Sequence, residues 1–295
     1  MIVRQKAFVF VVVLLEWTGQ FVSASDWKYG NEGAWPELCQ SGSRQSPIGL
    51  SPSIAMWKNF SRLIMEGYGQ RTVAVMKNNG HSAEVRLKHV QNPKVHGGGL
   101  PGFYELDHLH FHWQSEHTVD DIRFPLELHL VHHIKGMEMT EAVEHPNGVA
   151  VFAVMLEISP DDEEDFEPLL DILDNLKDTV GEVRQLTDFS VKDFLPKDKA
   201  GFYRYEGSLT TPNCNEGVIW TVFTNTLRIS RSQVKKFEQI KTTEKSPLTQ
   251  NFRGIQPLNG RAVYLKRSPV MDSSARGVVP SAWLAVSLVY VGLRW

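Results

Sequence analysis

The feature that most constrains this sequence is the alternation of polar and apolar side chains through residues 108–113. Side chains on a β-strand project to opposite faces in turn, so residues i and i+2 share a face. Three histidines therefore face one way and three large apolar side chains face the other, namely His108, His110 and His112 against Leu109, Phe111 and Trp113. The pattern predicts a strand whose apolar face is buried and whose other face gathers imidazoles.

A second segment, residues 125–133, carries Glu127 and His129 at the same spacing. If the two segments are neighbouring strands, three imidazoles can share one ion, and zinc held by three protein nitrogens keeps its fourth position for water. Spacing alone leaves open which two histidines of the first strand take part, and a His-rich surface strand without metal is the alternative. The two cysteines, Cys39 and Cys214, are expected to pair with each other rather than to bind metal.

Length and composition fit one globular domain. The chain has 295 residues, of which 42% are hydrophobic, and this suffices for a single domain with a large core. Its formal net charge of -3 shows no basic excess, so nucleic acid is not expected as a partner. No internal repeat is visible.

Apolar runs bounded by turn residues predict a mainly β protein. The expected strands cover residues 73–76, 83–87, 104–113, 126–133, 149–158 and 218–224. A helix is expected after Ser159-Pro160, with the acidic run 161–165 as its first turn rather than as a calcium site. A second, shorter helix is expected near residues 232–240.

Further short motifs follow one another in a fixed order along residues 27–265. They are Trp27-Lys28-Tyr29-Gly30, Gln45-Ser46-Pro47-Ile48, Asn78-Asn79-Gly80-His81, Gly98-Gly99-Leu100, His110-Phe111-His112-Trp113, Ser115-Glu116-His117-Thr118-Val119-Asp120, Glu127-Leu128-His129-Leu130-Val131-His132, Gly207-Ser208-Leu209-Thr210-Thr211-Pro212, Val218-Ile219-Trp220, Asn251-Phe252-Arg253 and Gln256-Pro257-Leu258. Together they resemble the α-class carbonic anhydrases, and in particular the extracellular members with a lipid anchor. The resemblance implies a twisted, mostly antiparallel ten-stranded sheet with short surface helices and zinc at the base of a conical cleft.

Carried over position by position, the resemblance assigns the metal site and its surroundings. His110, His112 and His129 take the places of the zinc ligands, and Glu127 that of the carboxylate that fixes the orientation of His129. The implied apolar pocket for carbon dioxide consists of Val131, Val151, Leu209, Thr211, Val218 and Trp220. Without the resemblance, Glu127 could be an ordinary surface carboxylate, and the pocket residues would be core in any β protein.

The resemblance also implies three catalytic residues. Thr210 matches the residue that orients a zinc hydroxide for attack on carbon dioxide, and Glu116 would accept the Thr210 hydroxyl proton. His81 matches the residue that passes the released proton to buffer, a role suited to a pKa near 6.5. The competing interpretations are an exposed turn histidine for His81 and a surface carboxylate for Glu116.

Three departures from the usual pattern of the family bear on activity. His108 stands where relatives commonly have a Gln that bonds the first zinc ligand, and an imidazole could still accept that bond. Gln114 and Ser115 follow Trp113 directly, so the loop at this rim is shorter than in many relatives. Glu84 replaces a residue that is often Asn and adds a negative charge near the proton shuttle.

The N-terminal residues 1–24 have the pattern of a secretory signal peptide, with basic residues before an apolar run and small residues at 22–24. An uncleaved anchor helix is the alternative. Secretion permits a disulfide, and both Cys39 and Cys214 match the positions of the bridge in extracellular family members. Asn59 begins a glycosylation sequon.

The C-terminal residues 272–295 resemble a glycosylphosphatidylinositol (GPI) attachment signal, with Ser273 or a neighbour as the attachment site and a mostly apolar tail behind it. The mature catalytic domain is then residues 25–271. A single C-terminal transmembrane helix is the alternative, although Pro280 shortens the usable span.

The expected function is that of a zinc-dependent lyase that interconverts carbon dioxide and bicarbonate at the outer face of the plasma membrane. Bicarbonate or proton transporters are expected partners, and the protein is expected to be a monomer. The alternative is a non-catalytic extracellular binding module on the same fold. Modules of that kind typically lack a zinc ligand, whereas this sequence keeps all three.

Overall fold

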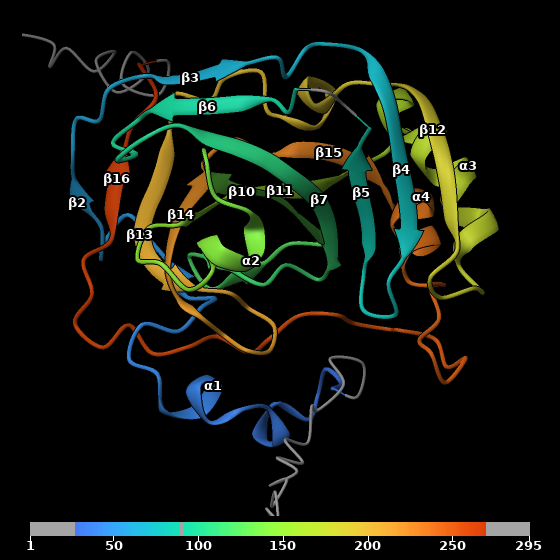
Figure 1. The fold of residues 1–295 in the computed structure, drawn as a ribbon, viewed down its shortest axis with the longest axis horizontal. Helices are drawn as coiled ribbons and strands as arrows, with labels where there is room; N and C mark the ends of the chain where they lie inside the picture. The colour runs from blue at the N-terminus through green and yellow to red at the C-terminus, as the bar shows by residue number, and fades with distance from the viewer. Residues whose placement is uncertain (1–26, 89–90, 270–295) are drawn as a thin grey trace, which may run out of the picture.

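The computed structural model describes residues 27–88 and 91–269. The expected signal peptide (1–24) and the expected anchor signal (272–295, with Ser273) lie outside these ranges. No helix in the described part combines the length and the apolar character needed to cross a bilayer. The fold is mainly β, as predicted, with one large mixed sheet and a few short helices (Figure 1).

Sixteen strands are present in the described residues. They are β1 (Gly49–Leu50), β2 (Met56–Trp57), β3 (Leu63–Glu66), β4 (Thr72–Asn78), β5 (Ala83–Leu87), β6 (Lys94–Gly97), β7 (Tyr104–Trp113), β8 (Thr118–Val119), β9 (Ile122–Arg123), β10 (Leu126–Ile134), β11 (Val149–Ser159), β12 (Val183–Phe189), β13 (Phe202–Ser208), β14 (Glu216–Phe223), β15 (Leu227–Ser230) and β16 (Tyr264–Lys266). The α-helices are α1 (Glu37–Ser41), α2 (Met139–Ala142), α3 (Glu167–Leu176) and α4 (Arg231–Phe237).

Ten strands form the main path of the large sheet, in the order β12-β4-β5-β7-β10-β11-β14-β13-β16-β2. Within the described ranges, the β11–β14 and β16–β2 junctions of this path are parallel and the other junctions are antiparallel. The prediction of a mostly antiparallel sheet is therefore confirmed, and the predicted ten strands match the main path, whereas the whole sheet has 13 strands in the described residues. Strands β3, β6 and β15 pair at its margins, and β1, β8 and β9 form a separate small sheet.

The two faces of the sheet carry two different apolar clusters. On one face, Leu109 and Phe111 of β7 pack with the leucines of α3 and with Phe237 of α4. On the other face, Val131, Val151 and Trp220 belong to a second cluster. Full burial of one such side chain contributes roughly 1.5–3 kcal/mol, so alternation along the central strands stabilises both layers at once.

The longer predicted helix begins later than the sequence suggested. The acidic segment does not form its first turn, because a 3-10 turn covers Glu164–Phe166 and α3 starts only at Glu167. The Asp162 carboxylate instead accepts hydrogen bonds from Ser230 and Ser232, and the Glu163 N–H donates to Gln233 at 3.0 Å. The segment is thus docked on the start of α4, where Ser230 and Gln233 form a capping box.

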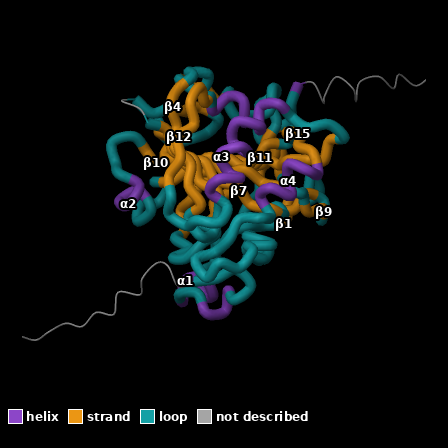
Figure 2. Tube along the Cα trace, turned by 90° about the vertical axis from the view of Figure 1, so that its right-hand side faces the viewer, coloured by secondary structure: helices purple, strands orange, loops and turns teal. Residues whose placement is uncertain are grey.

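Figures 1 and 2 both show α1 at one end of the molecule, with loops between it and the large sheet. The segment 249–260, orange-red in Figure 1, passes through this region. Its Asn251 and Arg253 reach the sheet and α1 respectively, because Asn251 bonds the backbone of β7 and Arg253 bonds the Cys39 carbonyl oxygen. These loops build the surroundings of the candidate site.

Candidate active site and metal centre

Two adjacent antiparallel strands bring the candidate metal ligands together. In the register of β7 and β10, His110 lies opposite His129, and His112 lies two residues along the same strand. One ring nitrogen from each of the three lies within 4.8 Å of the others, and His129 Nδ1 is 3.2 Å from His110 Nε2. His108 lies opposite Val131 and is not in this group among the described residues.

The hydrogen bonds of the three rings leave one nitrogen of each ring directed toward the position that they share. His112 Nε2 is buried without a hydrogen-bond partner in the described part of the chain, while its Nδ1 donates to the Asn251 carbonyl oxygen at 2.6 Å. His129 Nε2 donates to Glu127 at 2.7 Å, which leaves Nδ1 toward the cluster. Burial, and next the charges of neighbouring histidines, hold the pKa of His110 well below its usual value. The three imidazoles therefore fit a divalent metal ion with an open position.

A chain of buried hydrogen bonds supports His129. Glu127 Oε1 accepts from His129 and from His117 Nδ1, the latter at 2.7 Å, and Oε2 accepts from the His117 N–H at 2.8 Å. His117 Nε2 accepts from the Tyr205 hydroxyl at 2.7 Å. Burial acts to raise the pKa of Glu127, but His117 and His129 lower it well below its usual range. Although His117, Glu127 and His129 also lie within metal-binding distance, these bonds already occupy them.

The sequence reasoning gave no role to His117, Tyr205 or Asn251. His117 and Asn251 stand inside motifs that it quoted, directly after Glu116 and at the start of Asn251-Phe252-Arg253, so a signal was present. Tyr205 is 88 residues from His117, and nothing in the spacing connects them. All three hold other site residues in place rather than joining the cluster.

Glu116 lies beside the cluster. Its Oε1 accepts from the Arg253 N–H at 3.0 Å, and its Oε2 is 3.5 Å from His112 Nε2 with no hydrogen-bond partner in the described residues. Thr210 is buried, and no hydrogen bond joins it to Glu116 in the described part of the chain. The orienting pair Thr210 and Glu116 therefore stays a prediction.

His81 lies on the turn between β4 and β5, in contact with Trp27. Its ring stacks on Trp27 with centroids 3.8 Å apart and planes 9° from parallel. The backbone N–H of His81 donates to Asn79 Oδ1 at 3.0 Å. Burial lowers the pKa of His81 from its ordinary value, so the ring is neutral, and able to accept a proton, over more of the range below neutrality.

The model of the eukaryotic-type carbonic anhydrase family matches residues 23–267. The chain belongs to this family. It is 33% identical to carbonic anhydrase 15 of Mus musculus, over 97% of each chain. It is 34% identical to carbonic anhydrase 4 of Oryctolagus cuniculus, over 82% of each chain, and 34% identical to "Putative carbonic anhydrase 5" of Caenorhabditis elegans, over 89% of this chain and 87% of the relative. Carbonic anhydrases hydrate carbon dioxide, and this chain is an enzyme of that class.

In this carbonic anhydrase, the His108 ring stacks on His110 with centroids 5.1 Å apart, but its hydrogen bond goes to another residue. Its Nδ1 is 2.6 Å from the Asp107 carboxylate, and the His110 Nδ1 atom, whose bond an imidazole at position 108 could have accepted, has no partner among the described residues. Arg86 bridges Asp107 at 2.8 Å and Glu84 at 2.6 Å. The extra carboxylate of Glu84 is thus balanced by Arg86 rather than left as an isolated negative charge.

The connection that follows Trp113, which was expected to form a short rim, is tight. Gln114 adopts a positive φ of 59°, and its N–H donates to the Pro125 carbonyl oxygen at 2.8 Å. The Ser115 N–H donates to the Phe124 carbonyl oxygen at 2.8 Å. The link between β7 and β10 is therefore fastened to the start of β10, close to the metal cluster.

The residues expected to form the substrate wall share one apolar cluster. Val131, Val151, Val218 and Trp220 are buried in it, and Leu209 packs against it. The Trp220 ring centroid lies 4.9 Å from that of His129, so this wall adjoins the metal cluster. Thr211 is partly buried at the start of the following turn.

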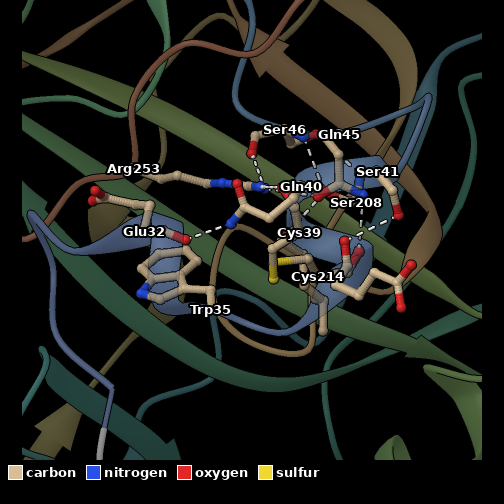
Figure 3. Close-up of a disulfide and its surroundings, with 12 residues drawn as sticks. Glu32, Trp35, Cys39, Gln40, Ser41, Gln45, Ser46, Ser208, Cys214 and Arg253 are labelled. Carbon is tan, nitrogen blue, oxygen red and sulfur yellow. Dashed lines mark hydrogen bonds between the residues drawn. A yellow bond between two sulfur atoms is a disulfide. The ribbon is translucent and has the colours of Figure 1, made fainter.

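Cys39 and Cys214 form the predicted disulfide, with an S–S distance of 2.04 Å (Figure 3). Beside it, Arg253 donates to Gln45 Oε1 at 2.8 Å and to the Ser46 carbonyl oxygen at 2.9 Å. Because the Arg253 N–H also bonds Glu116, the disulfide region is joined to the metal cluster through a single residue.

Proposed function

We propose that this carbonic anhydrase uses zinc, held by His110, His112 and His129, and acts at the extracellular surface of a membrane. The single observation that carries the proposal is the buried, unpartnered His112 Nε2 within a cluster of three imidazole nitrogens. When bound, zinc acts as a Lewis acid that brings the pKa of a water to about 7, which is the value established for carbonic anhydrases as a class. Three imidazole nitrogens with one open position suit that metal.

The remaining steps are assigned to the residues of the chain. Glu127 keeps His129 in one tautomer, so that Nδ1 stays directed to the metal position. Val131, Val151 and Trp220 offer carbon dioxide an apolar surface next to the cluster and exclude competing water. Thr210 is proposed to orient the attacking oxygen by donating its proton to Glu116, whose Oε2 lacks a partner in the described residues.

His81 is proposed to accept the proton released in each cycle and to pass it to buffer. The lowered pKa of His81, which burial causes, keeps the imidazole neutral at physiological pH. The stack on Trp27 fixes the ring at the edge of the fold rather than against the cluster. Proton transfer over that separation would run through intervening water.

We also propose that the enzyme is secreted and anchored by lipid. Residues 1–24 would be removed as a signal peptide, and residues 272–295 would be exchanged for a GPI anchor at Ser273 or a neighbour. The Cys39–Cys214 disulfide suits an oxidising compartment. A glycan at Asn59, a monomeric state and nearby bicarbonate or proton transporters complete this proposal, and a C-terminal transmembrane helix remains the alternative anchor.

The test compares the secreted domain, residues 25–271, with its His110→Asn variant. Zinc content and stopped-flow carbon dioxide hydration are measured on the same samples. We expect the wild type to hold one zinc per chain and to hydrate carbon dioxide rapidly, and the variant to lose both. His145→Asn is the control, because the side chain of His145 is 50% exposed and lies outside the cluster.

The same samples distinguish the rival function, an extracellular binding module without catalysis. Full zinc occupancy without turnover in the wild type would favour the rival. Absence of zinc from the wild type would overturn the ligand assignment. Retention of zinc and activity by His110→Asn would do the same.

A further inference from the structure

A cavity of about 420 Å³ lies apart from the metal cluster, on the side of β13 and β16. No histidine of the cluster lines it within the described residues. Its walls mix cations with aromatic and aliphatic side chains. They comprise Arg44, Lys58, Phe60, Gly99, Pro101, Asn147, Arg204, Tyr205, Glu206, Ile219, Arg261, Ala262 and Tyr264. The site already described uses only Tyr205 from this set.

Arg204 is the unusual member of this wall. It is only 5% exposed, yet it makes no ion pair with any described carboxylate. Its Nε donates to Thr221 Oγ1 at 3.2 Å, whereas its buried Nη2 has no partner in the described part of the chain. Its Nη1 lies beside Gly99, because a Cβ atom placed on residue 99 would be 3.6 Å from it. A buried guanidinium with most of its donors unused is costly unless an anion completes it.

Aromatic rings rather than carboxylates surround this charge. The Arg204 guanidinium lies 5.3 Å from the Phe60 ring centroid and 5.2 Å from that of Phe202. Cation–π contacts of this kind offset part of the desolvation, but they leave the N–H groups unbonded. Burial accordingly lowers the pKa of Arg204 to about 10. The guanidinium remains charged at neutral pH.

The rest of the wall adds positive charge with little to balance it. Arg261 makes no ion pair among the described residues and donates only to backbone carbonyl oxygens. The Lys58 ammonium lies 4.3 Å from the Tyr264 ring centroid and also lacks a carboxylate partner in the described ranges. Glu206 is the acidic residue of the wall, and it is paired with Arg44 at 3.5 Å at the exposed rim. The residues that line the cavity therefore carry a net positive charge.

We propose that this cavity binds a small organic carboxylate, with Arg204 as its main partner. The Nη1 group of Arg204 makes no hydrogen bond in the described residues and can donate a charge-assisted hydrogen bond to a carboxylate oxygen, whereas Nη2 is buried out of reach of the cavity. Water could satisfy the N–H groups but would leave the charge uncompensated. The apolar walls at Phe60, Ile219 and Tyr264 give the body of the ligand a surface to cover. The cavity also has far more room than a lone bicarbonate ion requires.

Benzoate is the probe, and the zinc-loaded domain is tested against its Arg204→Met variant. Thermal unfolding is followed at rising sodium benzoate with ionic strength held constant by sodium chloride. At ten times Kd we expect the Tm of the wild type to rise by roughly 3 to 5 °C more than that of the variant. Both proteins keep the zinc site, so any benzoate that binds there cancels in the difference.

Arg44→Gln is the matched control, because it removes a positive charge from the same rim but one already paired with Glu206 and Glu216. It should keep the full benzoate-dependent shift. Equal shifts in wild type and Arg204→Met would overturn the proposal. So would loss of the shift in Arg44→Gln to the same extent as in Arg204→Met, since general charge would then explain it.

A second measurement needs no variant, in case Arg204→Met does not fold. Crystals of the zinc-loaded wild type are soaked in 4-bromobenzoate and the bromine is located by anomalous scattering. A peak in the cavity, with the carboxylate density against Arg204, is the expected result. A peak at the metal cluster alone, or binding at crystal concentration only without a matching Tm shift in solution, would reject the site.

Discussion

At the scale of single residues, Glu127 combines complete burial with several hydrogen bonds to its carboxylate. One carboxylate accepts from two imidazoles and from the His117 N–H, all with the side chain fully buried. Each bond fixes a neighbour that has a second role, because His129 faces the metal cluster and His117 faces Tyr205. The negative charge also favours a metal cation nearby, because little water is present to screen it.

Glu127→Gln therefore should weaken metal binding far more than its small change in volume suggests. The amide can still accept from one imidazole, but its NH₂ group must face a donor and the charge is gone. We expect the zinc dissociation constant to rise about 10- to 100-fold, the range typical for such partners. Competition with a chromophoric chelator measures it.

Glu105→Gln on the same strand pair is the comparison, since Glu105 is partly exposed and lies 3.8 Å from Lys94. It should leave zinc affinity unchanged. A Glu127→Gln protein with wild-type zinc affinity would show that Glu127 is a structural residue only.

The sequence predicted correctly which strand residues share a face, but it left open the hydrogen bonds that depend on competition between neighbours. Alternation placed His110 and His112 on one face, and the structure brings them together with His129. For His108, the adjacent Asp107 offers a charged partner at 2.6 Å, which outcompetes a bond to another imidazole. The sequence pattern alone does not show which of these two partners His108 bonds.

At the scale of elements, the predicted central strands are present because each carries a long run of residues that are mostly buried on both faces, as in β7, β10 and β11. Strand β12 was not predicted. Its burial pattern has only Leu186 and Phe189 facing inward, and it lies at the edge of the sheet. An edge strand with one sparse apolar face has too weak a period to distinguish it from a loop.

Trp27 contributes to the site because its ring stacks on that of His81. Trp27→Ala should expose His81 and bring its pKa up from the value that burial depresses toward the ordinary 6.5. Because the neutral ring accepts the proton, the acidic limb of the kcat profile should move to higher pH. A ¹H–¹⁵N NMR titration of His81 and stopped-flow rates from pH 5 to 8 measure both effects.

Trp57→Ala serves as the comparison for that change, because Trp57 is an exposed tryptophan on β2, far along the sheet order from β4 and β5. It should alter neither the titration nor the profile. If the His81 titration moved in Trp27→Ala while the rate profile stayed fixed, His81 would not be the proton acceptor. A shift of the His81 pKa to lower pH would contradict the assignment of burial as its cause.

At the scale of the whole molecule, the metal cluster depends on contacts between segments far apart in the chain. Arg253 links the backbone near Cys39, the side chain of Gln45 and Glu116. Its motif was visible in the sequence, but the three partners lie 137 to 214 residues away. Long-range polar contacts of this kind are set by how loops cross, which local propensity does not encode.

The disulfide adds a covalent connection of this long-range kind, joining α1 to the turn after β13 across a separation of 175 residues. In the chain-entropy account, such a bridge restricts the unfolded chain and stabilises the fold by roughly 4 to 5 kcal/mol. The Cys39→Ser, Cys214→Ser double variant should therefore lose about that much free energy of unfolding in urea. Its folded fraction should still hydrate carbon dioxide, because the cluster histidines lie on β7 and β10, to which the bridge is not attached.

Urea titration of the wild type with and without reductant provides the control, since reduction should reproduce the loss seen in the double variant. A difference below about 1 kcal/mol would mean that the unfolded chain is not restricted by the bridge. Loss of turnover in the folded variant would have a different meaning. It would show that the bridge positions Glu116 through Arg253, so that stability and chemistry in this fold share one connection.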